Sequence, residues 1–218
     1  QPLSINNLSL QNRFVRSATW EGLATDAGLV TPKLISTMTE LADGGLGLII
    51  TGHAFVSPEG QAGPWQLGVY SDQCLSGLEQ MAQAVHDHGG RIVMQLAHAG
   101  NFTSEKLTGS PPLVVSDFEG LADSPRREAT LDDIQGLVQA FAQAAERARQ
   151  AGFDGIQIHS AHGYLLSQFL SPAFNLRTDD YGGTLENRSR LHREILQAVR
   201  DRVGPDVPLL IKINRRDF

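Results

Sequence analysis

"GFDGIQIHSAHGYLLSQFLSP", residues 152–172, is the stretch on which the interpretation of this chain depends. Two glycines near its start mark a turn, and the apolar run after them predicts a buried strand ending near His159. His162 and Tyr164 follow directly, so all three side chains are expected at or just beyond the carboxyl end of that strand. Ligands of parallel α/β proteins bind at this end of the sheet. The stretch therefore predicts both a strand and a candidate site.

Working outward, similar apolar runs recur along the chain, and the interval between each pair of runs contains a helical pattern. The runs are NRFVRSAT, LGLIIT, RIVMQLA, GIQIH and PLLIKIN. Strict alternation of strands and helices predicts a parallel sheet, either doubly wound or part of a (β/α)8 barrel. No G-x-G-x-x-G follows the first run, and polar residues occur inside several runs. Both observations favour the barrel over a dinucleotide-binding fold.

Four crossover helices are predicted, and their ends carry capping signals. The first has Thr31 as N-cap and ends at Gly44, and the third opens with a capping box at Thr130. The second lies around residues 78–85, and the fourth runs through "LENRSRLHREILQAVRDRVG", residues 185–204.

Period-2 alternation within the strands separates two faces. Apolar side chains such as Ile156 and Ile211 are expected to face the helices. The other face carries polar groups near the carboxyl ends, namely Ser17 with Thr19, Gln95, Gln157 with His159, and Lys212 with Asn214. A buried Lys212 would be costly unless an anionic group met it, so this face predicts a binding site.

Residues 101–129 form a connection far longer than the usual loop of about 4–6 residues. We expect it to serve as a lid or substrate loop. Its segment "PPLVVSDF" is apolar enough to pack against the rest of the protein.

The composition limits the classes of partner and cofactor that the protein is expected to bind. The 218 residues have a net charge of −6 with scattered Lys and Arg, which argues against nucleic acid and leaves small molecules open. The single cysteine, Cys74, excludes an internal disulfide, a four-cysteine zinc site and a protein-held iron–sulfur cluster within these residues. No apolar run approaches a membrane span of about 20 residues. We expect one domain, 1–218, in the cytoplasm, without a membrane partner and with the option of a homo-oligomer.

Metal chemistry is the alternative that the histidines raise. His53, His98, His159 and His162 all follow strands, and imidazoles are good zinc ligands. The first strand has no His-x-His, however, and the strand ends supply no obvious carboxylate ligand. A metal-dependent barrel hydrolase and a non-catalytic barrel fragment stay open as rival interpretations.

The stretch "HSAHGYLLSQFLSPAFNLRTDDYGGTLENRSR" resembles the old yellow enzyme family of FMN-dependent ene-reductases, also described as NADH:flavin oxidoreductases. The resemblance extends to "NRFVRSATWEG", "QLAHAGN" and "IKINRRDF", so it covers nearly the whole chain. It implies a (β/α)8 barrel that holds FMN at its carboxyl-end mouth. It also implies that NADH or NADPH reduces the flavin, and that an activated alkene, an enone, a nitro compound or a quinone reoxidises it.

The resemblance also implies roles for individual residues. His159 and His162 match the histidine pair that binds the substrate's oxygen, and Tyr164 matches the tyrosine that protonates the α-carbon. His159 is also expected to contact the cofactor. The other expected flavin contacts are Ser17, Ala18, Thr19, Gly52, Gln95 and Lys212, with Lys212 at a place where many members carry Arg.

A complete barrel has eight strands and about 250 residues, with a phosphate site after strands seven and eight. We therefore expect this chain to hold about the first five strands and to be truncated after the fifth. The FMN phosphate ligands and any C-terminal domain would then lie beyond Phe218. On this expectation, residues 1–218 by themselves are inactive.

Overall fold

A computed structural model of the protein describes residues 1–117 and 125–215. Within them, five parallel strands form one sheet in chain order. They are β3 (Val15–Arg16), β4 (Leu48–Phe55), β5 (Ile92–Ala97), β8 (Gly155–Ser160) and β9 (Leu209–Ile213). Each strand pairs with the next one along the chain, which is the order of a (β/α)8 barrel rather than of a doubly wound sheet. The predicted fold class is confirmed, with five barrel strands among the described residues.

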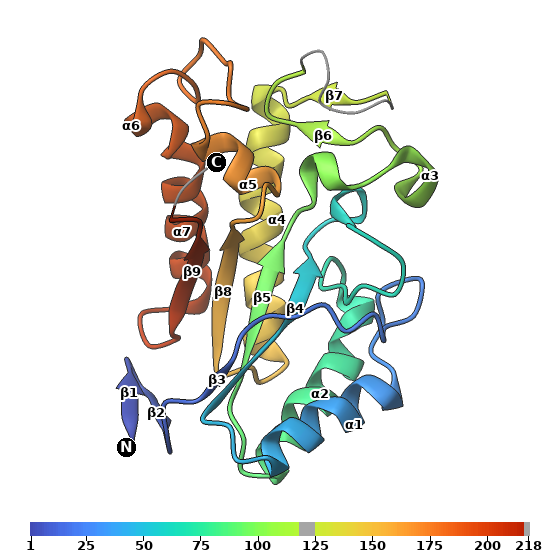
Figure 1. Ribbon diagram of the computed structural model, residues 1–218, viewed down its shortest axis with the longest axis vertical. Helices are drawn as coiled ribbons and strands as arrows, with labels where there is room; N and C mark the ends of the chain where they lie inside the picture. Colours follow the sequence, from blue (N-terminus) through green and yellow to red (C-terminus); the bar gives the residue numbers. More distant parts are fainter. Residues whose placement is uncertain (118–124, 216–218) are drawn as a thin grey trace.

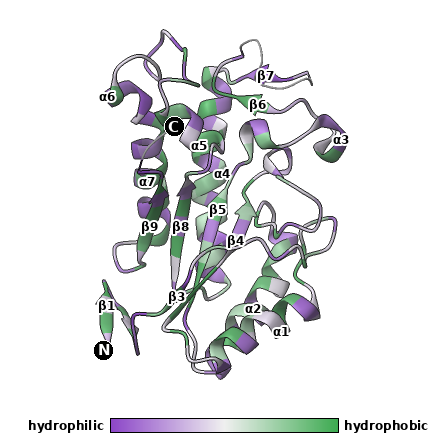
Figure 2. Cartoon of the chain, in the orientation of Figure 1, coloured by the Kyte–Doolittle hydropathy of each residue, from purple (hydrophilic) through white to green (hydrophobic). Residues whose placement is uncertain are grey.

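Four helices cross between these strands and cover one side of the sheet (Figure 1). They are α1 (Pro32–Asp43), α2 (Leu75–Asp87), α4 (Leu131–Gln150) and α7 (Arg190–Val203). Their inner stripes join the outward side chains of the strands, such as Ile92, Met94 and Ile156, in one continuous core. The strands β8 and β9 are largely hydrophobic in Figure 2, as strands covered by helices should be.

The predicted helix starts are confirmed in detail. The Thr31 hydroxyl accepts from the Leu34 N–H, and Thr130 and Asp133 form a reciprocal capping box at the start of α4.

The fourth predicted helix is wrong in one respect, because residues 185–204 form two helices. α6 (Leu185–Arg188) ends at Ser189, and α7 begins at Arg190. Thr184 caps α6 separately, and the Arg188 side chain donates to the Leu170 carbonyl at 2.8 Å. This contact ties the short helix to the end of α5, which precedes it in the chain.

A second apolar cluster lies on the inner side of the sheet and confirms the predicted alternation. It contains Leu48, Ile50 and Val93, with Ala18 and Leu210 packed against it. Leu8 and Leu10 close it from a hairpin formed by β1 (Leu3–Ile5) and β2 (Leu8–Leu10). The hairpin was not predicted, and it lies at the end of the sheet away from the arrowheads in Figure 1.

The remaining short elements gather mainly near the carboxyl ends of the strands (Figure 1). They are η1 (Pro58–Gly60), η2 (Asp72–Cys74), η3 (Gly100–Phe102), α3 (Glu105–Thr108), β6 (Leu113–Val114), β7 (Arg127–Glu128) and α5 (Leu165–Leu170). β6 and β7 pair in parallel, and Val114 and Val115 are buried, so the expected packing of the long connection is confirmed for its described part. Phe118 of that segment lies outside the described residues.

None of the helices within these described ranges combines the length and the apolar character needed to cross a bilayer.

Candidate active site

His159 is the inward side chain nearest the carboxyl end of β8, and it is 3% exposed. Its Nδ1 is buried and has no hydrogen-bond partner among the described residues. Burial, reinforced by the nearby His53, His162 and Lys212, lowers the pKa of His159 to about 3. The imidazole is therefore neutral at ordinary pH. A buried ring nitrogen without a partner marks a place where a ligand would complete the hydrogen bonding.

The turn after β8 brings His162 and Tyr164 against this ring. His162 and Gly163 both adopt left-handed backbone conformations, with φ of 62° and 76°. Glycine does this at little cost, but a histidine does not, and such strain concentrates at functional sites. The His162 ring lies 5.1 Å from that of His159, and the Tyr164 ring 4.9 Å from it. The predicted trio is therefore one cluster.

A β-bulge in β4 adds a residue that sequence reasoning did not place in the site. Ile50 pairs with Val93 and His53 with Gln95, so three steps along β4 oppose two along β5. Simple alternation from Ile50 would turn Gly52 inward and His53 outward, and the extra residue reverses this. His53 consequently shares the inner face with Gln95. Its Nε2 lies 3.1 Å from the Tyr164 hydroxyl.

Backbone N–H groups at the bulge have hydrogen-bond partners. The Thr51 hydroxyl accepts from the Gln95 N–H at 3.2 Å, and Glu21 Oε1 accepts from the Gly52 N–H at 3.1 Å. A Cβ on Gly52 would overlap Glu21 Oε2 and the Thr19 carbonyl. In this structure the room left by Gly52 is thus taken by the segment that follows β3. The predicted place of Gly52 beside a flavin ring stays a prediction.

Two amides form a polar layer that lies one inward position below His159 and level with His53. Gln95 and Gln157 are register partners on β5 and β8, and Gln95 Nε2 donates to Gln157 Oε1 at 2.6 Å. Both are buried, at 1% and 8% exposure. Gln95 lies one inward position above the apolar Val93 on β5, whereas the apolar Leu210 on β9 is level with Gln157. The next inward residue after Leu210 is Lys212, so on both β5 and β9 the inner face changes from apolar to polar toward the carboxyl end.

Lys212 lies in register with His159 on the neighbouring strand β9 and so shares its face. Burial and the Lys212 charge lower the pKa of His162, and burial raises that of Tyr164. Lys212 has no ion pair with a carboxylate in the described part of the chain. Lys212 and the neutral histidines therefore offer positive potential and N–H donors to an electron-rich ligand.

The residues after β3 lie at the same mouth. Ala18 packs against the inner apolar cluster, while Ser17 and Thr19 are exposed. The Thr19 hydroxyl donates to the Ser17 carbonyl at 3.1 Å. Glu21 forms a 2.7 Å ion pair with Arg16, which holds this segment against β4.

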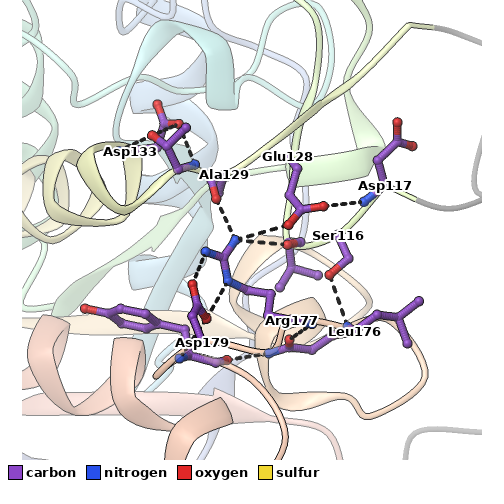
Figure 3. Close-up of polar contacts among 12 residues, drawn as sticks. Ser116, Asp117, Glu128, Ala129, Asp133, Leu176, Arg177 and Asp179 are labelled. Carbon is purple, nitrogen blue, oxygen red and sulfur yellow. Dashed lines mark hydrogen bonds and ion pairs between the residues drawn. The ribbon is translucent and has the colours of Figure 1, made fainter.

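Arg177 anchors the long connection (Figure 3). Its guanidinium donates to the carbonyls of Ala129, at 2.5 Å, and Val115, at 3.3 Å, and to both carboxylate oxygens of Asp179. The Arg177 side chain is 7% exposed. It joins the strand ends β6 and β7 to the segment after α5. This anchor was also missed, because no local pattern links residues so far apart.

The metal alternative gains no support from the geometry. In residues 1–117 and 125–215, no three His, Cys, Asp or Glu side chains are grouped so as to hold a metal ion. His98 instead accepts from the Gly100 N–H at 3.1 Å and is enclosed against Gly60.

Comparison with known proteins gives consistent matches. A family model described as the NADH:flavin oxidoreductase / NADH oxidase family matches residues 1–217. An NADH oxidase of Thermoanaerobacter brockii is 38% identical over 98% of this chain and 33% of its own length. An NADPH dehydrogenase of Clostridium acetobutylicum is 36% identical over 99% of this chain and 63% of its own. The crystal structure of an old yellow enzyme from Pichia sp. AKU4542 matches with a TM-score of 0.92 and 30% identity, over 98% of this chain and 58% of that one.

These matches confirm the family resemblance that the sequence indicated. The chain spans from about a third to under two thirds of the length of these relatives. The individual roles of the site residues remain predictions.

Proposed function

Because the chain belongs to the NADH:flavin oxidoreductase / NADH oxidase family, we propose that the protein is an FMN-dependent oxidoreductase of the ene-reductase type. In this proposal NADH or NADPH is the reductant, and an activated alkene, an enone, a nitro compound or a quinone is the acceptor. When bound, FMN supplies hydride transfer at its N5. The residues of this chain supply binding, polarisation and a proton.

The described residues fit the ring of such a cofactor. The inner face offers amides at Gln95 and Gln157, a cation at Lys212 and neutral imidazoles, which suits a heteroaromatic ring that becomes electron-rich on reduction. The buried, unpartnered Nδ1 of His159 is the observation that most directly calls for a ligand. Gln95 and Lys212 would hold the ring, while Ser17, Ala18, Thr19 and Gly52 would border it.

His159 and His162 would bind the oxygen of the acceptor. Both have lowered pKa values, mainly through burial, so each carries one N–H rather than a full charge at neutral pH. Two N–H donors on one oxygen draw electron density away from the β-carbon, which then accepts hydride more readily. Losing one donor of this kind typically costs about 10²–10³ in rate.

Tyr164 would protonate the α-carbon. Burial raises its pKa, so the phenol keeps its proton until the substrate takes it. Its ring is held edge-on against His159 and at 5.6 Å from Phe102. A positioned general acid typically accelerates a reaction by a factor of about 10²–10⁴.

The observation that carries this proposal is the convergence of His159, His162 and Tyr164 on one side of a polar amide layer. The test is stopped-flow measurement of both half-reactions of the FMN-loaded, complete protein. Reduction by NADH or NADPH followed by reoxidation with cyclohexenone would support it. A protein that binds no FMN, or a reduced protein that no alkene reoxidises, would refute it.

The remaining expectations complete the proposal. Residues 1–218 form one domain, the N-terminal portion of an FMN-binding barrel. The partners are small molecules rather than nucleic acid or membrane, a homo-oligomer is compatible with the fold, and the protein works in the cytoplasm, where NAD(P)H is supplied.

A further inference from the structure

His53 is the inward residue of the β4 bulge, and it meets the proposed proton donor directly. Its Nε2 is 3.1 Å from the Tyr164 oxygen, and the two rings meet edge to face at 5.3 Å. The His53 carbonyl accepts from Gln66 Nε2 at 2.9 Å, which fixes the backbone beyond the bulge. His53 is therefore held against Tyr164 from both its backbone and its ring.

We propose that His53 is a positioning residue for Tyr164, donating its Nε2–H to the phenolic oxygen so that the phenol's own hydrogen is left for the substrate. This inference rests on the proposed function. The hydrogen bond strengthens as the proton leaves, because negative charge then develops on the Tyr164 oxygen. In that step the O–H bond of Tyr164 breaks, a C–H bond forms at the α-carbon, and water later returns a proton to the phenolate.

The electrostatic surroundings support a neutral His53. Burial, together with the electrostatic effects of His162 and Lys212, lowers the pKa of His53 to about 4. The other titratable group facing it is His159, whose ring lies 6.2 Å away and whose pKa is also lowered. At neutral pH His53 therefore carries a single N–H. That N–H has to be on Nε2 for the phenol to remain free as a donor.

Two substitutions separate a hydrogen-bond role from simple packing. His53→Phe keeps a ring against Tyr164 but removes the donor, whereas His53→Gln keeps an N–H donor. His88→Phe is the matched control, because His88 precedes β5 at the opposite end of the sheet and pairs with Asp43. All three are made in the complete, FMN-loaded protein.

The first readout is the pKa of Tyr164, followed by NMR with tyrosine labelled at the ring carbon that bears the hydroxyl. Tyr164→Phe identifies the signal by deleting it. We expect a higher Tyr164 pKa in His53→Phe than in the parent, and a value close to the parent's in His53→Gln and His88→Phe. An unchanged pKa in His53→Phe would overturn the proposal.

The second readout is reoxidation of the reduced protein. We expect His53→Phe to slow cyclohexenone reduction by about 10- to 100-fold, as for a lost hydrogen bond to a charged group, with little change for a quinone that needs no carbon protonation. Equal slowing with both acceptors would overturn the positioning role. A parent that reduces no alkene would refute the proposed function alone, because the pKa comparison still tests the contact between His53 and Tyr164.

Discussion

Gln95 donates a 2.6 Å hydrogen bond to Gln157 across neighbouring strands, on the inner face of the sheet and one inward position below His159. The bond leaves one N–H and the carbonyl oxygen of Gln95 for other partners, so it sets which edge the amide presents upward. This pair of amides is expected to contribute both to the free energy of unfolding and to cofactor binding.

Replacing Gln157 by Leu should reduce the free energy of unfolding by about 1–3 kcal/mol, because the buried Gln95 donor loses its partner. Urea unfolding of the complete protein measures it. The double replacement Gln95→Leu with Gln157→Leu should cost less than the two single changes added together, since no buried donor is then left unpaired. Strict additivity would show that the two amides do not act as a pair.

His159→Ala and His162→Ala should each weaken binding of phenolic ligands and slow alkene reduction by about 10²–10³. Reduction of the flavin by nicotinamide should be affected less, because these imidazoles are expected to meet the acceptor's oxygen. Stopped-flow spectroscopy separates the two half-reactions. Unchanged reoxidation rates in both variants would contradict the assignment.

Tyr164→Phe should retain phenol binding and slow alkene reduction by a factor of about 10²–10⁴, because it removes a proton donor and little volume. Quinone reduction should survive in the same protein. If the rates of alkene and quinone reduction fall equally, Tyr164 is structural, and its packing against Phe102 would then be its main role.

The sequence predicted the repeating strands and helices because each depends on local signals. Caps at Thr31 and Thr130, and the period-2 spacing that puts Val93 and Gln95 on one face, need no information from distant residues. The site trio was predictable for the same reason, since it lies within six residues at one strand end.

The features that were missed depend on pairing between distant segments. His53 turns inward only because one residue is inserted against β5, and a bulge leaves no periodic signature in a strand of eight residues. A glycine at the expected inward position, followed by a histidine, was the one available hint. The parallel pairing of β6 with β7 and the split at Ser189 likewise depend on contacts that form only in the folded chain.

Arg177→Met should destabilise the anchor of the long connection. Breaking a fully buried ion pair costs about 3–5 kcal/mol, and we expect about 2 kcal/mol here because Asp179 is 36% exposed and can be solvated. Limited proteolysis should cut more readily between residues 101 and 129. Arg202→Met, which removes an exposed ion pair with Glu146, is the control and should change neither the free energy of unfolding nor the rate of proteolysis. Equal effects of the two substitutions would deny Arg177 a special anchoring role.

Acidification should destabilise the protein over two pH ranges that overlap only at about pH 3–4. Burial lowers the pKa of His53 to about 4, that of His159 to about 3 and that of His192 to about 4. Between the ordinary histidine pKa of about 6.5 and these values, the unfolded chain binds more protons than the folded one, so stability falls as pH falls. Asp133, whose pKa is lowered to about 2 chiefly by Arg127, contributes only below about pH 4.

Urea unfolding between pH 7.5 and 5 therefore isolates the histidines. The slope is expected to stay below about 1.4 kcal/mol per pH unit for each histidine, because the unfolded chain can bind at most one more proton per histidine than the folded chain. The double variant His53→Gln with His159→Gln should flatten this range, leaving the contribution of His192. Asp133→Asn should leave this range unchanged and alter only the more acidic one. A parent protein equally stable at pH 7.5 and 5 would contradict the burial of these imidazoles in the neutral form.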